Sequence, residues 1–179
     1  MFEAFRERMG RRALKAAVRS RTARGMSSDP SGRSVLILLP DDEDGLRATW
    51  PFVEALDVPM KNLTCVVVSE RVAYAPDQFA GSVQRITRAD LDWRGLPRAE
   101  VLASLHGTAD VAINLADPND LAATFLIGTS SAAVRIGQHG PATEPFYDLM
   151  LAGAQSASEL VGALRRALAR IEPPILPVS

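Results

Sequence analysis

The stretch from Ser34 to Leu39 reads SVLILL, and the stretch from Asp110 to Leu115 reads DVAINL. Both are short, nearly continuous apolar runs, which is typical of parallel strands that are buried on both faces. A segment with helical spacing of apolar residues follows each of them. This alternation of strand and helix predicts an α/β domain in which helices cover both faces of a parallel sheet.

Across the rest of the chain, the same alternation predicts a three-layer, Rossmann-like or flavodoxin-like sheet of five to six strands. The expected strand order is 3-2-1-4-5, with any sixth strand beside the fifth and right-handed crossovers between them. The expected strands are Ser34–Leu39, Leu63–Glu70, Ser82–Ile86, Asp110–Leu115, Ala132–Ile136 and Tyr147–Leu151.

Prolines and capping residues indicate where the helices begin. Pro51 interrupts the first helix of the domain, so we expect that helix to start near Thr49. Pro97 suits the first position of the next helix. Asp117 followed by Pro118 predicts a helix with Asp117 as its N-cap.

The final helix has its own start pattern. Ser156 and Glu159 are three residues apart, which is the spacing of a capping box. We therefore expect the last helix of the domain to begin at Ser156.

The charge of the chain is unevenly distributed. Its 179 residues carry a net charge of -1, but residues 1–25 hold eight basic and two acidic residues, a net charge of +6. The remaining residues carry a net charge of -7. The predicted organisation is a basic amphipathic helix (1–25), a linker (26–33), an α/β domain (34–172) and a Pro-rich tail (173–179).

Composition excludes several classes of site. Cys65 is the single cysteine, so neither an internal disulfide nor a multi-cysteine zinc site can form, and it is expected as a packed core thiol. Neither a Gly-Lys-Ser/Thr phosphate loop nor a Gly-x-Gly-x-x-Gly turn occurs. We therefore expect no cofactor and no metal. The N-terminus lacks the apolar core of a signal peptide, and a cytoplasmic location is expected.

The basic N-terminal segment predicts binding to an anionic partner. Clustered arginines favour phosphate backbones, and RNA or the ribosome is the expected partner. The predicted phosphate contacts are Arg8, Arg11, Arg12, Lys15, Arg19 and Arg21. A second interpretation places the helix on an anionic membrane, with an apolar face made of Phe2, Phe5, Met9, Ala13 and Ala16.

A candidate ligand crevice lies where the first and fourth strands end, because ligands of such sheets bind at the carboxyl ends of the strands near the switch point. Its predicted residues are Asp41, Asp42, Asn114 and Asp117. Such a crevice would repel phosphates unless a divalent cation were present. Helix capping and loop solvation explain the same carboxylates. The basic segment could also fold back onto this crevice, in which case high salt should release it.

Two resemblances follow from motifs. The basic opening Met1-Phe2-Glu3, Asp90–Pro97, Asp110–Leu115 and Tyr147–Met150, in this order, resemble an uncharacterised bacterial family of unknown function with a basic N-terminal helix and a small α/β domain. Residues 108–138 are similar to the N-terminal Rossmann-like half of heptosyltransferase-type glycosyltransferases. That resemblance implies a shared fold with a lost or different activity.

Taken together, these patterns predict a non-enzymatic cytoplasmic binding protein whose basic helix engages RNA or the ribosome. The main alternative is a small-ligand-binding or degenerate glycosyltransferase-like domain that uses the crevice. Peripheral membrane association through the N-terminal helix is the third interpretation.

Overall fold

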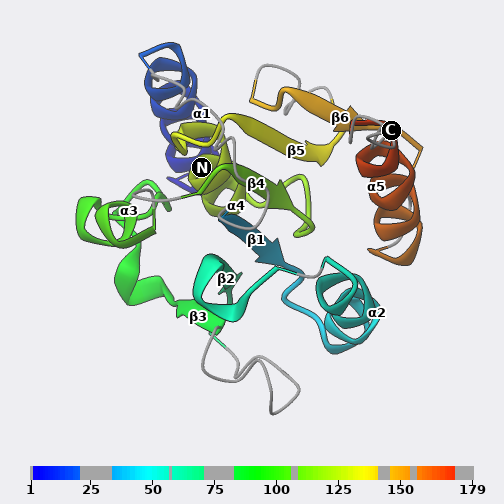
Figure 1. The fold of residues 1–179 in the computed structure, drawn as a ribbon. Helices are drawn as coiled ribbons and strands as arrows, with labels where there is room; N and C mark the ends of the chain where they lie inside the picture. The colour runs from blue at the N-terminus through cyan, green and yellow to red at the C-terminus, as the bar shows by residue number, and fades with distance from the viewer. Residues whose placement is uncertain are drawn as a thin grey trace, which may run out of the picture.

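Six parallel strands form one sheet in the order β3-β2-β1-β4-β5-β6 (Figure 1). The structure is a computed structural model, and it describes residues 2–20, 34–56, 58–70, 83–105, 109–140, 146–153 and 157–171. The strands are β1 (Val35–Leu39), β2 (Leu63–Val68), β3 (Val83–Ile86), β4 (Val111–Asn114), β5 (Val134–Gln138) and β6 (Leu149–Leu151). The helices are α1 (Phe2–Arg19), α2 (Glu43–Glu54), α3 (Ala99–Leu105), α4 (Leu121–Thr129) and α5 (Ala157–Ile171), with short 3-10 turns η2 (Met60–Asn62) and η4 (Arg88–Asp90).

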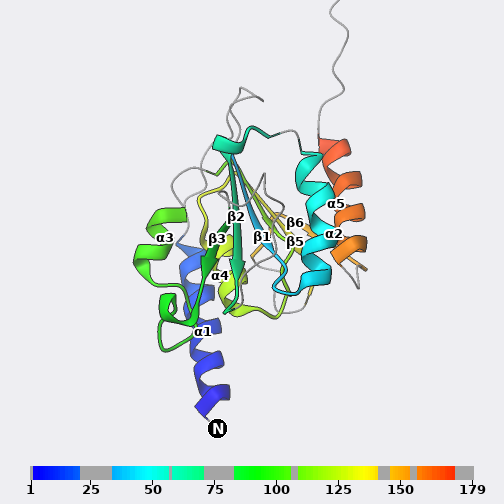
Figure 2. The same cartoon turned by 90° about the horizontal axis from the view of Figure 1, so that it is seen from below.

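The central strand β1 explains why the domain has three layers. Successive strand residues point to opposite faces of a sheet. Val35, Ile37 and Leu39 pack in one cluster with α2 and α5, whereas Leu36 and Leu38 pack in a second cluster with α3 and α4. The helices accordingly lie on both sides of the sheet (Figure 2). The predicted fold class and strand order, including the sixth strand beside the fifth, are confirmed.

The starts of α2 and α3 differ from the predicted ones. The helix α2 begins at Glu43, not near Thr49, and it contains Pro51. Pro51 forfeits one backbone hydrogen bond, but the burial of its neighbours, Trp50 among them, outweighs that loss. The helix α3 begins at Ala99, because Pro97 is held in an isolated bridge to Leu91.

The N-terminal helix α1 packs on the outside of α4, mainly through residues outside the apolar face that the sequence pattern indicates. Leu14 is buried in a cluster with residues of α4, and Gly10 lies against Leu121. Of the apolar face that the sequence pattern indicates, Ala13 packs against this cluster, whereas Phe5 and Ala16 are exposed. The packed face of α1 contains the small residues Gly10 and Ala17, which allow the two helices to approach closely.

The two helices α1 and α4 run side by side in the same direction. Gly10 neighbours Leu121 at the start of α4, and Val18 neighbours Gly128 near its end. The first turns of α1 therefore extend past the carboxyl end of the sheet (Figure 2). The expectation that the basic segment docks on the acidic crevice through its charge is wrong for α1, since apolar contacts hold this helix on α4.

Some predictions fall outside the described residues. They concern the linker 26–33, the tail 173–179, Arg21, and Ser156 of the predicted capping box. Cys65 is fully buried as expected, and burial raises the pKa of its thiol to about 12. Within the described ranges, none of the helices combines the length and the apolar composition needed to cross a membrane.

Candidate functional site

The carboxyl ends of the central strands form two adjoining depressions. One, of about 430 Å³, lies over the ends of β2 and β3 and is lined in part by Asp41, Asp42 and Glu70. The other, of about 280 Å³, lies at the switch point between β1 and β4 and is lined in part by Asp41 and Asp117. Asp41 and Val68 line both. The structure therefore brings Asp41, Asp42 and Asp117 to one edge of the sheet, as predicted.

Asp42 is the N-cap of α2. Its Oδ1 accepts a hydrogen bond from the backbone N–H of Gly45 at 2.7 Å. Glu43 and Asp44 follow in the first turn, where negative charge is favourable to the helix dipole. Glu43 also pairs with Arg47 at 2.7 Å, one turn further along. Most of this acidic loop thus serves to start α2.

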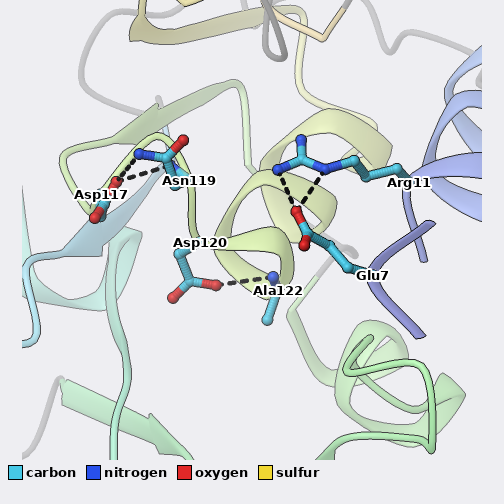
Figure 3. A network of polar contacts seen from close by, with 6 residues as sticks. All are labelled: Glu7, Arg11, Asp117, Asn119, Asp120 and Ala122. Carbon is cyan, nitrogen blue, oxygen red and sulfur yellow. Dashed lines mark hydrogen bonds and ion pairs between the residues drawn. The ribbon is translucent and has the colours of Figure 1, made fainter. Parts of the chain in front are cut away.

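Asp117 does not cap α4, which corrects the sequence prediction. Its Oδ1 accepts hydrogen bonds from the backbone N–H and from Nδ2 of Asn119, at 2.8 and 3.1 Å (Figure 3). This closes a turn in which the Asp120 N–H donates to the Asp117 carbonyl at 2.9 Å. The helix begins three residues later than expected because residues 117–120 form that turn first.

Asp120 is the true N-cap of α4, and the sequence prediction misses it. Its Oδ1 accepts from the N–H of Ala122 at 2.8 Å (Figure 3) and from the N–H of Ala123 at 3.0 Å. A signal for this role is present in the sequence, because Asp120 directly precedes the apolar run of α4.

Asn114 is buried beneath the edge and does not line either depression. Its Oδ1 accepts from the Ala116 N–H at 3.0 Å, and its Nδ2 donates to the Tyr147 hydroxyl at 2.7 Å. Burial raises the pKa of Tyr147, so this hydroxyl stays protonated. Asn114 therefore links β4 to the segment before β6, and its side-chain oxygen satisfies the backbone N–H of Ala116.

As far as the chain is described, the depression between β1 and β4 is lined by carboxylates and by no basic side chain, whereas Arg88 joins the carboxylates that line the larger depression. Burial raises the pKa of Asp120, the two helix N–H groups oppose that rise, and the neighbouring charges of Asp41 and Asp117 add to it. Like charges close enough to perturb one another would repel a phosphate. Among the described residues, no group of three or more His, Cys, Asp or Glu side chains is arranged to hold a metal ion.

Asp120 provides a test of this electrostatic description. Its raised pKa means that, between the ordinary carboxyl value and the raised one, the folded state binds more protons than the unfolded state, so stability falls as pH rises through that window. Asp120→Asn keeps an N-cap oxygen without the charge, so it should lose this pH dependence and be at least as stable as the parent at about pH 7.

Asp120→Ala is the matched variant, because it removes the charge and the cap together. It should be less stable than Asp120→Asn by about 1 kcal/mol, within a range of about 0.5–2. Urea denaturation at about pH 4 and about pH 7 measures both effects. If Asp120→Asn were destabilised at both pH values by as much as the alanine variant, the described cap would be wrong.

One exposed side of α1 is basic. The side chains of Arg8, Arg12, Lys15 and Arg19 are exposed, at intervals of four, three and four residues. That spacing places them on one side of the helix, away from Leu14. We call these four exposed residues the basic stripe.

Among the predicted phosphate contacts that the structure describes, Arg11 lies outside this stripe. It is half-buried and forms an ion pair with Glu7 at 2.8 Å (Figure 3). Part of its charge is therefore neutralised within the helix.

Comparison with known proteins adds a family but no activity. No curated protein and no solved structure matches the chain. A family model matches residues 6–163, from within α1 to within α5. This range covers both the basic stripe and the acidic edge, so the chain belongs to DUF6913, a family of unknown function.

Proposed function

We propose that this is a non-enzymatic cytoplasmic protein that binds the phosphate backbone of RNA, free or in the ribosome, through the basic stripe on α1. The supporting observation is that α1 is held on the domain by its opposite face. Leu14 of α1 is buried against residues of α4, and Gly10 of α1 lies against Leu121. The cationic side chains consequently occupy one side of an anchored helix.

The geometry of the stripe suits a phosphate backbone. From Arg8 to Arg19 the helix rises about 16 Å, at about 1.5 Å per residue. Three of the four residues are arginines, whose guanidinium groups contact phosphate oxygens in bidentate fashion. The acidic edge of the sheet repels the same backbone, which restricts binding to the α1 side of the molecule.

A membrane is the less favoured anionic partner. Leu14, Ala17 and Val18 pack against α4 or its neighbours, so they are not available to enter a lipid surface. Among the described α1 side chains, Phe5 is the large apolar one that is exposed. A stable interfacial helix needs a continuous apolar face. Of the face predicted for a membrane, Ala13 packs against the cluster around Leu14 and the exposed Ala16 is small, so little large apolar surface is left for lipid.

The crevice alternative has weaker support. Asp42, Asp117 and Asn114 are engaged by backbone groups or neighbouring side chains. Asp41 is exposed at the centre of an electronegative edge, which disfavours the nucleotide sugars that a glycosyltransferase-like domain would take. A small-ligand or degenerate transferase role thus stays a prediction without a supporting contact.

The proposed function predicts a large change in salt dependence. Replacing Arg8, Arg12, Lys15 and Arg19 together by glutamine should weaken binding to an RNA oligonucleotide. It should also reduce the slope of log K against log salt by about three, at about 0.7 for each phosphate that the variant no longer neutralises. Fluorescence anisotropy at several salt concentrations measures both the affinity and the slope.

The control variant removes the same number of charges elsewhere. Lys61, Arg47, Arg85 and Arg166 are exposed and lie outside α1. Replacing these four by glutamine should leave the slope unchanged. Equal decreases in affinity in the two variants would mean that net charge, and not the stripe, attracts RNA, and the proposal would fail.

A further inference from the structure

A depression of about 350 Å³ opens on the surface of α1 itself, and we call it the α1 pocket. It lies where the basic stripe borders the docked face of the helix, because Arg11 is three residues after Arg8 and three before the buried Leu14. Among the described residues, its lining comprises four cations, one carboxylate and one small side chain: Ala4, Glu7, Arg8, Arg11, Arg12 and Lys15. The composition of this pocket favours an anion.

Glu7 and Arg11, which both line the α1 pocket, form an ion pair that is open to solvent. Arg11 donates from Nε and from Nη2 to the same oxygen, Glu7 Oε1, at 3.0 and 2.8 Å (Figure 3). The Glu7 side chain is 57% exposed. A pair this exposed contributes little to stability, because water and salt screen it. Another anion can therefore replace Glu7 at low energetic cost.

A phosphate group suits Arg11 better than Glu7 does. The Nε and Nη2 groups of a guanidinium are spaced to contact two oxygens of one anion, and a phosphodiester presents two. Glu7 offers a single oxygen to both donors. A phosphate in the pocket would also be attracted by Arg8, Arg12 and Lys15, which line it with Arg11.

We propose that the α1 pocket binds one phosphate of the RNA backbone, and that this phosphate replaces Glu7 as the partner of Arg11. This inference rests on the proposed function and adds Arg11 as a phosphate contact beside the four residues of the basic stripe. It also gives Glu7 a role. The Glu7 carboxylate competes with RNA for Arg11, so it limits the affinity of α1 for the backbone.

Glu7→Gln in the full-length protein tests this competition. Glutamine is as good a helix former as glutamate, so α1 stays intact while Arg11 loses its ionic partner. Binding of an oligouridylate of about 12 nucleotides, measured by fluorescence anisotropy, should tighten by about two- to fivefold. That is the factor expected when RNA no longer has to break an exposed ion pair.

Glu43→Gln is the matched control. Glu43 forms the same kind of pair with Arg47, at 2.7 Å and one helical turn apart, but on α2. The substitution changes the net charge by the same amount away from the α1 pocket, and its effect on affinity should be smaller. A gain as large as that of Glu7→Gln would mean that net charge alone strengthens binding, and the exchange of partners at Arg11 would be wrong.

Arg11→Gln identifies the group for which Glu7 competes. It should weaken binding and reduce the slope of log K against log salt by about 0.7, the value for one phosphate contact. In that background, Glu7→Gln should raise the affinity no more than Glu43→Gln does, because the ion pair is already gone. The proposal would be overturned if Glu7→Gln kept its full effect without Arg11, or if Arg11→Gln bound RNA as the parent does.

The variant that lacks the basic stripe separates this inference from the proposed function. If that variant bound RNA as tightly as the parent, the proposed function itself would fail. If it lost binding while Glu7→Gln and Glu43→Gln had equal effects, only the exchange at Arg11 would fail. If the parent bound no RNA but floated with phosphatidylserine vesicles, both proposals would fail in favour of a membrane.

Discussion

Leu14→Ala should lower the free energy of unfolding by about 2–5 kcal/mol, as expected when a fully buried leucine is truncated and leaves a cavity. Leu14 is 1% exposed and lies in one cluster with Leu96, Phe125 and Phe146. The substitution removes much of the apolar packing that holds α1 on α4. Urea denaturation gives the magnitude.

Phe5→Ala is the matched control, because Phe5 lies on the same helix and belongs to the apolar face that the sequence pattern indicates. At 54% exposure its truncation should change stability by less than about 0.5 kcal/mol. A larger effect at Phe5 than at Leu14 would show that α1 docks by the other face. The position of the basic stripe would then be wrong as well.

Hydrogen exchange would show whether the loss of Leu14 packing loosens α1 alone. In Leu14→Ala, the amides of α1 should exchange faster than those of the central strand β1, because local opening of α1 leaves the sheet intact.

Truncation of residues 1–25 is a poorer test of RNA binding than substitution of the basic stripe. It would expose the apolar surface of α4 around Phe125 and alter the domain along with the charge.

Gly137→Ala should destabilise the protein by about 1–3 kcal/mol through overpacking. Gly137 lies in β5, and an added Cβ would come within 2.5 Å of Tyr147 Cε2 and Cζ. The ring cannot easily move aside, because it is buried and its hydroxyl accepts the hydrogen bond from Asn114. Differential scanning calorimetry or urea denaturation measures the decrease in stability.

A double-mutant cycle identifies the cause. In a Tyr147→Ala background, which is itself destabilised, adding Gly137→Ala should have little further effect, because the ring that the methyl group would meet is gone. Gly162→Ala in α5 is the glycine control. The nearest atom to its added Cβ is Arg166 Nη1 at 3.6 Å, so this substitution should stabilise the helix by about 0.5–1 kcal/mol. A neutral Gly137→Ala in the parent would contradict the described packing.

Local patterns are sufficient for the sheet but not for the starts of its helices. The apolar run of β1 and the strand–helix alternation predict a parallel sheet with the observed order. The same patterns place the start of α4 at Asp117, because aspartate followed by proline is a strong capping pattern. A second aspartate, Asp120, lies three residues after Asp117. The turn closed by Asn119 places Asp120, and not Asp117, at the cap position.

The candidate sites likewise include residues that the sequence predicts and contacts that it does not. The basic residues of α1 and the acidic edge at Asp41 and Asp117 could be named from charge and strand position. The contact between the Arg94 carbonyl and Gly10 could not, because the two residues are far apart in sequence and meet only when α1 docks. The residue pattern of neither segment predicts that contact.

Apolar patterning and charge along the chain are enough to define the α/β class, the strand order and the separation of a basic N-terminal segment from an acidic domain. The buried face of α1, in contrast, depends on tertiary packing. Several sides of that helix are apolar enough to dock, but Gly10 and Leu14 match the surface of α4 in shape. Close packing depends on the shapes of both partners, and one helix's sequence contains only one of them.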